Sequence, residues 1–80
     1  MKLPRDLSGK ELVAGLCRRW DYHVVHQVGS HVLLATDTPG HQRISIPTHK
    51  HLAVGTLGNI LRAVAEHKGV SRDTILSSIK

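Results

Sequence analysis

Phenylalanine is absent from this 80-residue sequence, and Trp20 and Tyr22 are its only aromatic residues besides histidine. Aliphatic side chains must therefore supply the hydrophobic core. A chain of this length buries only about 60% of the surface that its unfolded form exposes. We therefore expect a single domain over residues 1–80 with one thin core.

Cysteine is almost absent as well. Cys17 is the only one, so no intramolecular disulfide can form and a disulfide-stapled secreted scaffold is excluded. No apolar run is long enough to cross a bilayer, and the first residues show no hydrophobic region of signal-peptide length. We expect a cytoplasmic protein with no membrane partner.

Acidic residues are in the minority. Eleven Lys and Arg face six Asp and Glu, which gives a formal charge of +5, and there are seven histidines in addition. This balance favours a polyanionic partner such as nucleic acid. A basic surface that is merely solvated explains the charge equally well, so composition alone leaves both interpretations open.

The first periodic segment predicts a helix. Ser8-Gly9-Lys10-Glu11 has the form of a capping box, in which Ser8 and Glu11 accept hydrogen bonds from backbone N–H groups at the helix start. The residues that follow at three- and four-residue spacings form one apolar stripe. They are Leu12, Val13, Leu16, Cys17 and Trp20.

Three segments rich in β-branched residues follow this helix. In the first, Tyr22, Val24, His26 and Val28 alternate with the residues between them, as expected for a half-buried strand. Gly29-Ser30 predicts a two-residue type II′ turn, the 37–40 segment predicts a second turn, and Pro47 ends the third strand. The predicted strands are Tyr22–Val28, His31–Thr36 and Gln42–Ile46.

Two further helices are predicted after a loop over residues 48–55. Thr56 is the expected cap of a helix that ends near Gly69, and Ser71 is the expected cap of a short last helix. The sequence therefore predicts an α+β domain of the order α-β-β-β-α with a short extra C-terminal helix. Its three-stranded antiparallel sheet needs helices over one face.

Seven histidines raise the question of a metal site, and their spacing argues against one. His49-x-His51 falls in a loop. His23-x-x-His26 falls in a strand, where residues three apart point to opposite faces. Neither pair has the helical or zinc-finger spacing of common metal sites. We expect no metal and no other cofactor.

His31 differs from the other histidines because it follows a tight turn that fixes its position without crowding it. An imidazole can transfer protons near neutral pH, as a general acid or base must. For the residue by itself, a local structural role with a backbone hydrogen bond is the favoured interpretation. Arg43, His49, Lys50 and His51 would bring cations to His31 if the loop folded back towards the first hairpin.

The whole chain resembles the HicA family, also called YcfA-like, of bacterial and archaeal toxins. The resemblance begins with a helix containing Leu12 and Leu16 and rests on the order and separation of several short motifs. These motifs are Gln27-Val28-Gly29-Ser30-His31, Ile46-Pro47-Thr48-His49, Gly55-Thr56-Leu57 with Ile60-Leu61-Arg62, and Gly69-Val70-Ser71.

The resemblance implies a fold similar to double-stranded-RNA-binding domains and a function as an mRNA interferase. Such a toxin cleaves mRNA without a metal and is neutralised by a HicB-like antitoxin. His31 would be the catalytic histidine. Our own candidate for a second proton carrier is His49. The expected RNA contacts, on a basic surface made by the sheet edge and the loop after the third strand, are Arg43, Lys50, Ser30 and His26.

The chain departs from the family pattern at two places. Where many members have Gly and an aromatic residue after the first helix, this chain has Trp20-Asp21-Tyr22. Where a basic residue is common just before the turn, Val28 stands here, and His26 compensates only when protonated.

Two other functions remain open from the sequence. One is a non-catalytic RNA-binding module of the same fold. The other is a protein-interaction domain whose basic face recognises an acidic partner.

Overall fold

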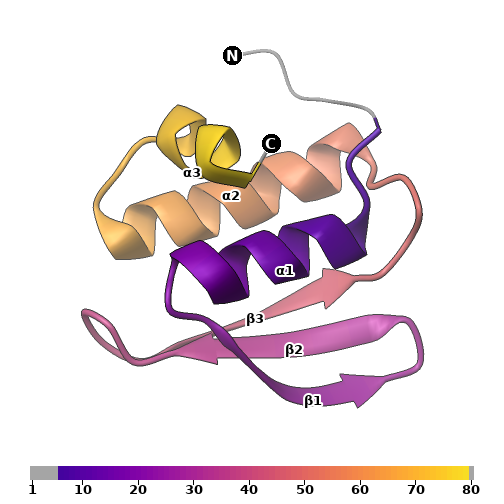
Figure 1. The fold of residues 1–80 in the computed structure, drawn as a ribbon, viewed down its shortest axis with the longest axis horizontal. Helices are drawn as coiled ribbons and strands as arrows, with labels where there is room; N and C mark the ends of the chain where they lie inside the picture. The colour runs from indigo at the N-terminus through magenta and orange to yellow at the C-terminus, as the bar shows by residue number, and fades with distance from the viewer. Residues whose placement is uncertain (1–5, 80) are drawn as a thin grey trace.

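Three helices and a three-stranded sheet make up the structure (Figure 1). The structure is a computed structural model and describes residues 6–79. Its strands pair antiparallel in the order β1-β2-β3, which confirms the predicted α+β class and the meander. The elements are α1 (Gly9–Arg19), β1 (His23–Val28), β2 (His31–Thr36), β3 (Gln42–Pro47), α2 (Val54–Lys68) and α3 (Arg72–Ile79).

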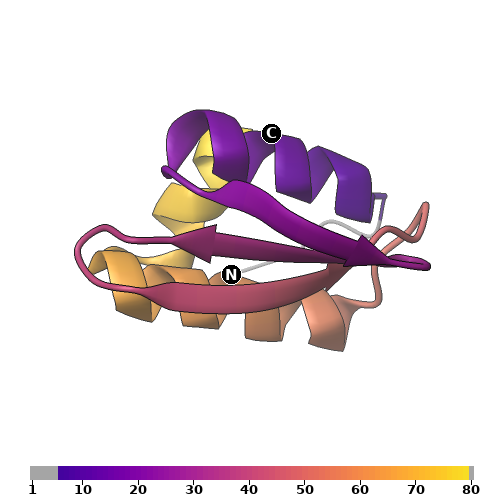
Figure 2. The ribbon, with the colours of Figure 1, turned by 90° about the horizontal axis from the view of Figure 1, so that it is seen from below.

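The helices are stacked on one side of the sheet. α1 and α2 lie side by side over one face, and α3 packs on both of them on the side away from the strands (Figures 1 and 2). Within residues 6–79, no helix covers the opposite face of the sheet. We call this uncovered side the outer face.

The core between the sheet and the helices is aliphatic, as the composition predicts. Apolar burial is the main stabilising contribution, at about 1.5–3 kcal/mol for each fully buried large aliphatic side chain. The largest fully buried hydrophobic side chains are Leu7, Leu12, Leu16, Leu34, Ile46, Leu57, Leu61, Val64 and Ile75.

The capping box of α1 is present as predicted. The Glu11 N–H donates to Ser8 Oγ at 3.1 Å, and the Ser8 N–H donates to Glu11 Oε1 at 3.1 Å. The helix ends at Trp20, and Asp21 then adopts a left-handed conformation with φ 60°. Aspartate is among the few non-glycine residues that tolerate this region. Asp21 therefore makes the turn into β1 without a glycine.

The first hairpin has the predicted two-residue turn. Val28 pairs with His31, so only Gly29 and Ser30 connect the strands. Gly29 has φ 56°, whereas Ser30 is not among the described residues with positive φ. This is the pattern of a type II′ turn, which needs the freedom of glycine at its first central position alone.

The predicted strict alternation of side chains between the two faces of β1 is wrong. His23 pairs with Ala35 and Val24 with Leu34, but the next pair is His26 with Leu33. The register shift leaves Val25 as the extra residue of a β-bulge, which moves every later side chain to the other face. His23 and His26 therefore point to the same side of the sheet.

The start of α2 also differs from the expectation. The helix begins at Val54, and Ala53 is the N-cap residue, with no hydrogen bond from a side chain. Thr56 lies inside the first turn, because the backbone bond from the Leu57 N–H to the Ala53 carbonyl (2.9 Å) already closes that turn. At the other end of the chain, the Thr74 N–H donates to Ser71 Oγ at 3.1 Å, which confirms the predicted cap of α3.

Tyr22 connects the start of the sheet to α2. Its side chain is 3% exposed, and its hydroxyl donates to Gln42 Oε1. The Gln42 amide in turn donates to the Ala63 carbonyl at 3.0 Å. Lys68 Nζ lies 4.9 Å from the centre of the ring. Burial raises the pKa of Tyr22 to about 12.

This shift makes the free energy of unfolding fall in alkali. The unfolded chain loses the Tyr22 proton near pH ~10, whereas the folded protein keeps it until about 12, so stability decreases as pH rises between these values. We expect a loss of about 1–2 kcal/mol, measured by denaturant titration at several pH values. Tyr22 is the only tyrosine, so phenolate absorbance reports it alone. Tyr22→Phe should remove this part of the pH dependence, and a folded protein that ionises near pH ~10 would contradict the assignment.

Candidate functional site

The outer face of the sheet is a regular array of side chains from all three strands. Residues directly opposite one another in antiparallel strands point to the same face. Because Val32, Leu34 and Ile46 are buried under the helices, the positions that alternate with them face outward. The register gives three rows across β1, β2 and β3, which are His23-Ala35-Arg43, His26-Leu33-Ser45 and Val28-His31-Pro47.

Histidine is the main polar residue of this face. His23, His26 and His31 are exposed, as are Arg43 and Ser45, and no acidic residue is among the nine. Sequence reasoning missed His23 here, because the bulge at Val25 has no evident signature in the residue pattern.

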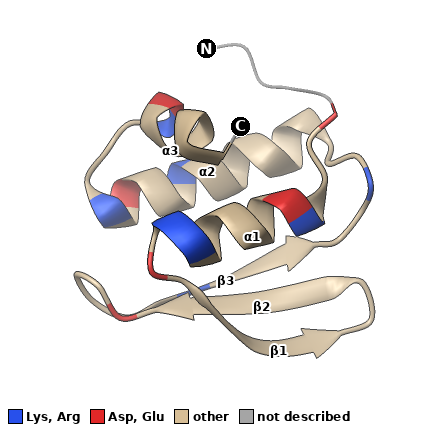
Figure 3. Ribbon diagram, viewed as in Figure 1, with Lys and Arg blue, Asp and Glu red and all other residues tan. Residues whose placement is uncertain are grey.

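Most of the fixed positive charge of the described residues lies outside the sheet. Among the described residues, Arg43 is the only Lys or Arg on a strand, and Lys50 lies in the loop after β3 (Figure 3). The remaining described cations are on the helices: Lys10, Arg18, Arg19, Arg62, Lys68 and Arg72.

His31 is the first residue of β2, directly after the type II′ turn. It faces outward between Val28 on β1 and Pro47 on β3, at the spacing of about 4.5–5.5 Å between Cβ atoms that is typical of opposed residues. Its neighbours across the sheet are thus apolar, and its own side chain is exposed. The strand pairing on both sides fixes its backbone.

The loop after β3 returns to the first hairpin. The Thr48 N–H and hydroxyl both donate to the Ser30 carbonyl, at 2.6 and 3.1 Å. The Gly9 N–H donates to the His49 carbonyl at 2.9 Å. His31 and His49 each follow a residue of the Ser30–Thr48 pair, so their backbones lie on neighbouring segments, while the His49 carbonyl is held by the start of α1.

Lys50 and His51 are exposed in the same loop, immediately before α2. The loop is fastened at its far end by the Leu52 N–H, which donates to the Leu7 carbonyl at 3.0 Å. α2 then presents its N-terminal N–H groups and the positive end of its dipole, without a side-chain cap. The turn, the loop and the start of α2 lie at the same end of the molecule (Figure 1). We call this end, defined by residues 29–31 and 48–55, the turn end.

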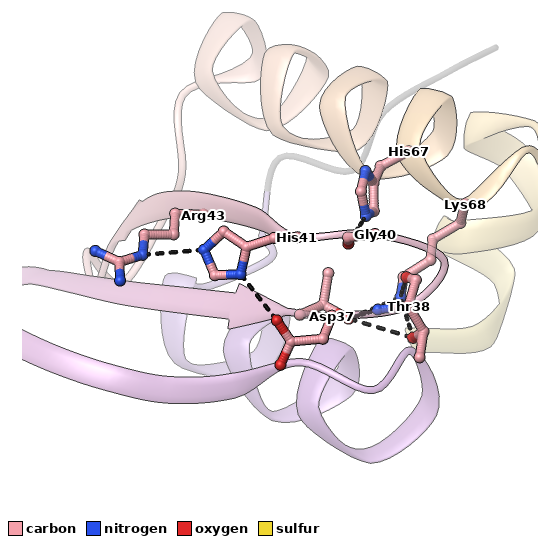
Figure 4. A network of polar contacts seen from close by, with 8 residues as sticks. Asp37, Thr38, Gly40, His41, Arg43, His67 and Lys68 are labelled. Carbon is pink, nitrogen blue, oxygen red and sulfur yellow. Dashed lines mark hydrogen bonds and ion pairs between the residues drawn. The ribbon is translucent and has the colours of Figure 1, made fainter.

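Arg43 is not part of the turn end. It lies four residues before Pro47, which is about 14 Å along β3. There its Nε donates to His41 Nε2 at 3.3 Å, and His41 Nδ1 bonds to Asp37 Oδ1 at 2.8 Å (Figure 4). The hydrogen bond from His41 lowers the pKa of the Asp37 carboxyl. The predicted pairing of Arg43 with His31 at one phosphate therefore has no support in the geometry.

His26 is nearer to His31 than Arg43 is. It lies on the adjacent strand, diagonally across from His31, at the roughly 7–8 Å that separates diagonal neighbours on one face of a sheet. Ser30 contributes its carbonyl to the contact with Thr48. His26 thus lies beside the strand residue that follows the turn.

A pocket of about 380 Å³ lies beyond the other end of β2 and contains none of the predicted site residues. Lys68 reaches into it, but its ammonium donates to Thr36 Oγ1 at 3.0 Å and to the carbonyl and hydroxyl of Thr38 (Figure 4). Burial lowers the pKa of Lys68, while Asp21 nearby acts in the opposite sense. These bonds give Lys68 a structural role, in which it ties α2 to the second turn. The lining residues are Arg19, Trp20, Asp21, Thr38, Pro39 and Lys68.

The comparisons with known proteins identify no relative of this chain. No protein-family model matches the chain, and no curated protein or solved structure matches it significantly. Over residues 6–79, no three His, Cys, Asp or Glu side chains are grouped so that they could hold a metal ion. None of the described helices has the length and apolarity needed to span a membrane.

Proposed function

We propose that this protein is a cytoplasmic endoribonuclease that cleaves mRNA without a metal and without any other cofactor, and that His31 is its catalytic histidine. The observation that carries this proposal is the junction of two segments at the turn end. The Ser30–Thr48 hydrogen bonds join the turn that holds His31 to the loop that carries His49 and Lys50. The resemblance to HicA toxins, with their fold similar to double-stranded-RNA-binding domains, points to the same chemistry.

RNA supplies its own nucleophile in this reaction. A base removes the proton of the 2′-hydroxyl, and the 2′ oxygen attacks the adjacent phosphorus. The bond to the 5′ oxygen then breaks, and an acid gives that oxygen a proton. The enzyme needs two proton carriers and a stabiliser of the phosphorane charge. His31 and His49 take the first roles in either order, while Lys50 and the N-terminus of α2 take the last.

Phosphates outside the cleaved bond require separate contacts. Arg43, about 14 Å along β3 from Pro47, suits a second phosphate of the same strand of RNA. Ser30 directly precedes His31, and His26 lies in the middle row of the outer face, between the rows of His31 and Arg43, so both can contact the same RNA strand. Each phosphate contact of this kind contributes to affinity and to its salt dependence.

The resemblance also implies an inhibitory partner, a HicB-like antitoxin. The free edge of β1 offers a place for such a protein to bind, because Val24 is 52% and Val28 64% exposed there. An unpaired strand edge with apolar side chains is a common site for strand addition. A protein bound along β1 would stand beside His31 and obstruct access to it.

The reaction mechanism predicts which RNA is cleaved. A chimeric oligonucleotide with 2′-deoxyribose at the cleaved position lacks the nucleophile and should remain intact, whereas the all-ribose strand is cut. Cleavage should persist in excess chelator and leave a 2′,3′-cyclic phosphate, both visible by gel electrophoresis and mass spectrometry. Cleavage of the deoxy-substituted strand, or its loss with chelator, would overturn the mechanism. Binding of intact RNA would instead identify a non-catalytic RNA-binding module.

A further inference from the structure

Two histidines of the outer face have no role in the cleavage chemistry. His23 and His26 occupy successive outward positions on β1, and the bulge at Val25 is what places both on this face. His26 lies diagonally from His31, and His23 follows it along β1 towards the opposite end of the sheet. All three are exposed.

The surroundings of this row suit nucleobases. Between β1 and β3, the central column of the outer face consists of Ala35, Leu33 and His31, and the first two are small or aliphatic. Ala35 is only 2% exposed although it faces outward, so the accessible part of this column is the partly buried Leu33 and the exposed His31. Imidazole rings beside such a surface give unpaired bases a place to stack, as other open sheets do with aromatic side chains.

The charges along the same line do not repel a nucleic acid. Lys50 stands at the turn end and Arg43 at the opposite end of the face, and none of the nine outward residues is acidic. Two acidic residues lie at the far end of the row: Asp37, whose carboxylate is paired with His41 and interacts electrostatically with His23, and Asp21, two residues before His23 in the chain. A strand of RNA that leaves His31 along the row therefore meets no carboxylate until that end.

We propose that His26 and His23 form a stacking row for unpaired RNA bases, which runs across the outer face from the reacting phosphate at His31. This inference rests on the proposed function and names its substrate as single-stranded RNA. Duplex RNA is recognised through phosphates and 2′-hydroxyls, with its bases already paired and stacked. Because Arg43 is the single fixed cation of the outer face, this face can make few contacts to the phosphates of a duplex.

The test measures binding apart from cleavage. A 2′-O-methyl RNA strand that contains 2-aminopurine has no free 2′-hydroxyl and stays intact, and its fluorescence reports stacking of the base. With the wild-type protein, we expect quenching and tighter binding of the single strand than of its duplex. His26→Ala should weaken single-strand binding about tenfold and remove much of the quenching.

Two further variants separate stacking from other effects. His26→Phe keeps a flat ring and should restore binding and quenching, whereas a role for His26 as a cation predicts no rescue. Val24→Ala lies on the same strand but pairs with Leu34 on the helix side, so it should bind like the wild type.

The experiments can contradict the stacking row and the proposed nuclease function separately. Equal binding by wild type and His26→Ala, or preference for the duplex, overturns the stacking row even if all-ribose RNA is cleaved. Binding with quenching but without cleavage of all-ribose RNA supports the row and overturns the nuclease. A wild-type protein that neither binds nor cleaves RNA overturns both.

Discussion

Replacing His31 with alanine will lower kcat/KM for RNA cleavage by about 10²–10⁴-fold, the range usual for loss of a general acid or base. The fold should not change. His31 is exposed, and its backbone is held by pairing with Val28 and Pro47, which alanine preserves. The free energy of unfolding should stay within about 0.5 kcal/mol of wild type, because substitutions at such surface positions are seldom larger. Cleavage of labelled RNA, denaturant unfolding and circular dichroism measure these effects.

Two controls test whether the measured cleavage depends on His31 and whether a second histidine takes part. Wild type and His31→Ala purified in parallel carry the same contaminating nucleases, so equal cleavage by both would show that the activity is not this protein's or does not need His31. His49→Ala tests the second proton carrier. If His31 and His49 act as an acid and base pair, each variant should lose a different limb of the pH-rate profile. Unchanged profiles in His49→Ala would leave His31 as the only histidine involved.

The local elements were predictable because their signals are local. A capping box needs only Ser8 and Glu11, and a two-residue turn needs only a glycine at the correct position, so both are visible in the sequence. The aliphatic core follows from periodicity in the same way. The start of α2 was not predictable, because its position depends on the burial of Leu52 and its contact with Leu7 in a distant part of the chain. Thr56 is a good capping residue by type, but packing sets the helix start at Ala53.

The site was predictable only in part, for a related reason. The loop after β3 was expected to approach the first hairpin, and the Ser30–Thr48 bonds place its first residue there, whereas His49 and Leu52 are bonded to Gly9 and Leu7 near the start of α1. The expected pairing of Arg43 with His31 failed, because the distance between them is fixed by the strand register. His23 was missed because one extra residue in β1 exchanges the two faces of a strand. A bulge depends on pairing with β2, and the composition of β1 alone does not show it.

A methyl group added at Gly9 should be among the most damaging substitutions in the protein. Gly9 is buried at the start of α1, and a Cβ there would stand 1.8 Å from the Pro47 carbonyl oxygen. That oxygen belongs to backbone paired with His31, so it cannot move without disturbing the strand. We expect Gly9→Ala to lower the free energy of unfolding by about 3 kcal/mol or more, at the upper end for overpacking. A domain of this size has a total stability of roughly 4–12 kcal/mol, so the midpoint in denaturant should fall sharply.

The same substitution at Gly55 provides the control, and it should act in the opposite direction. Gly55 is exposed in the first turn of α2, and no atom lies within 4 Å of the Cβ that alanine would add. Alanine is the better helix former, so Gly55→Ala should raise the free energy of unfolding by about 0.5–1 kcal/mol. Gly9→Ala, by contrast, displaces Pro47, which pairs with His31, and the His49 carbonyl that the Gly9 N–H binds. Its cleavage activity should therefore fall even under conditions where the protein remains folded. Equal stability of the two alanine variants would show that α1 does not press on the end of β3 in this way.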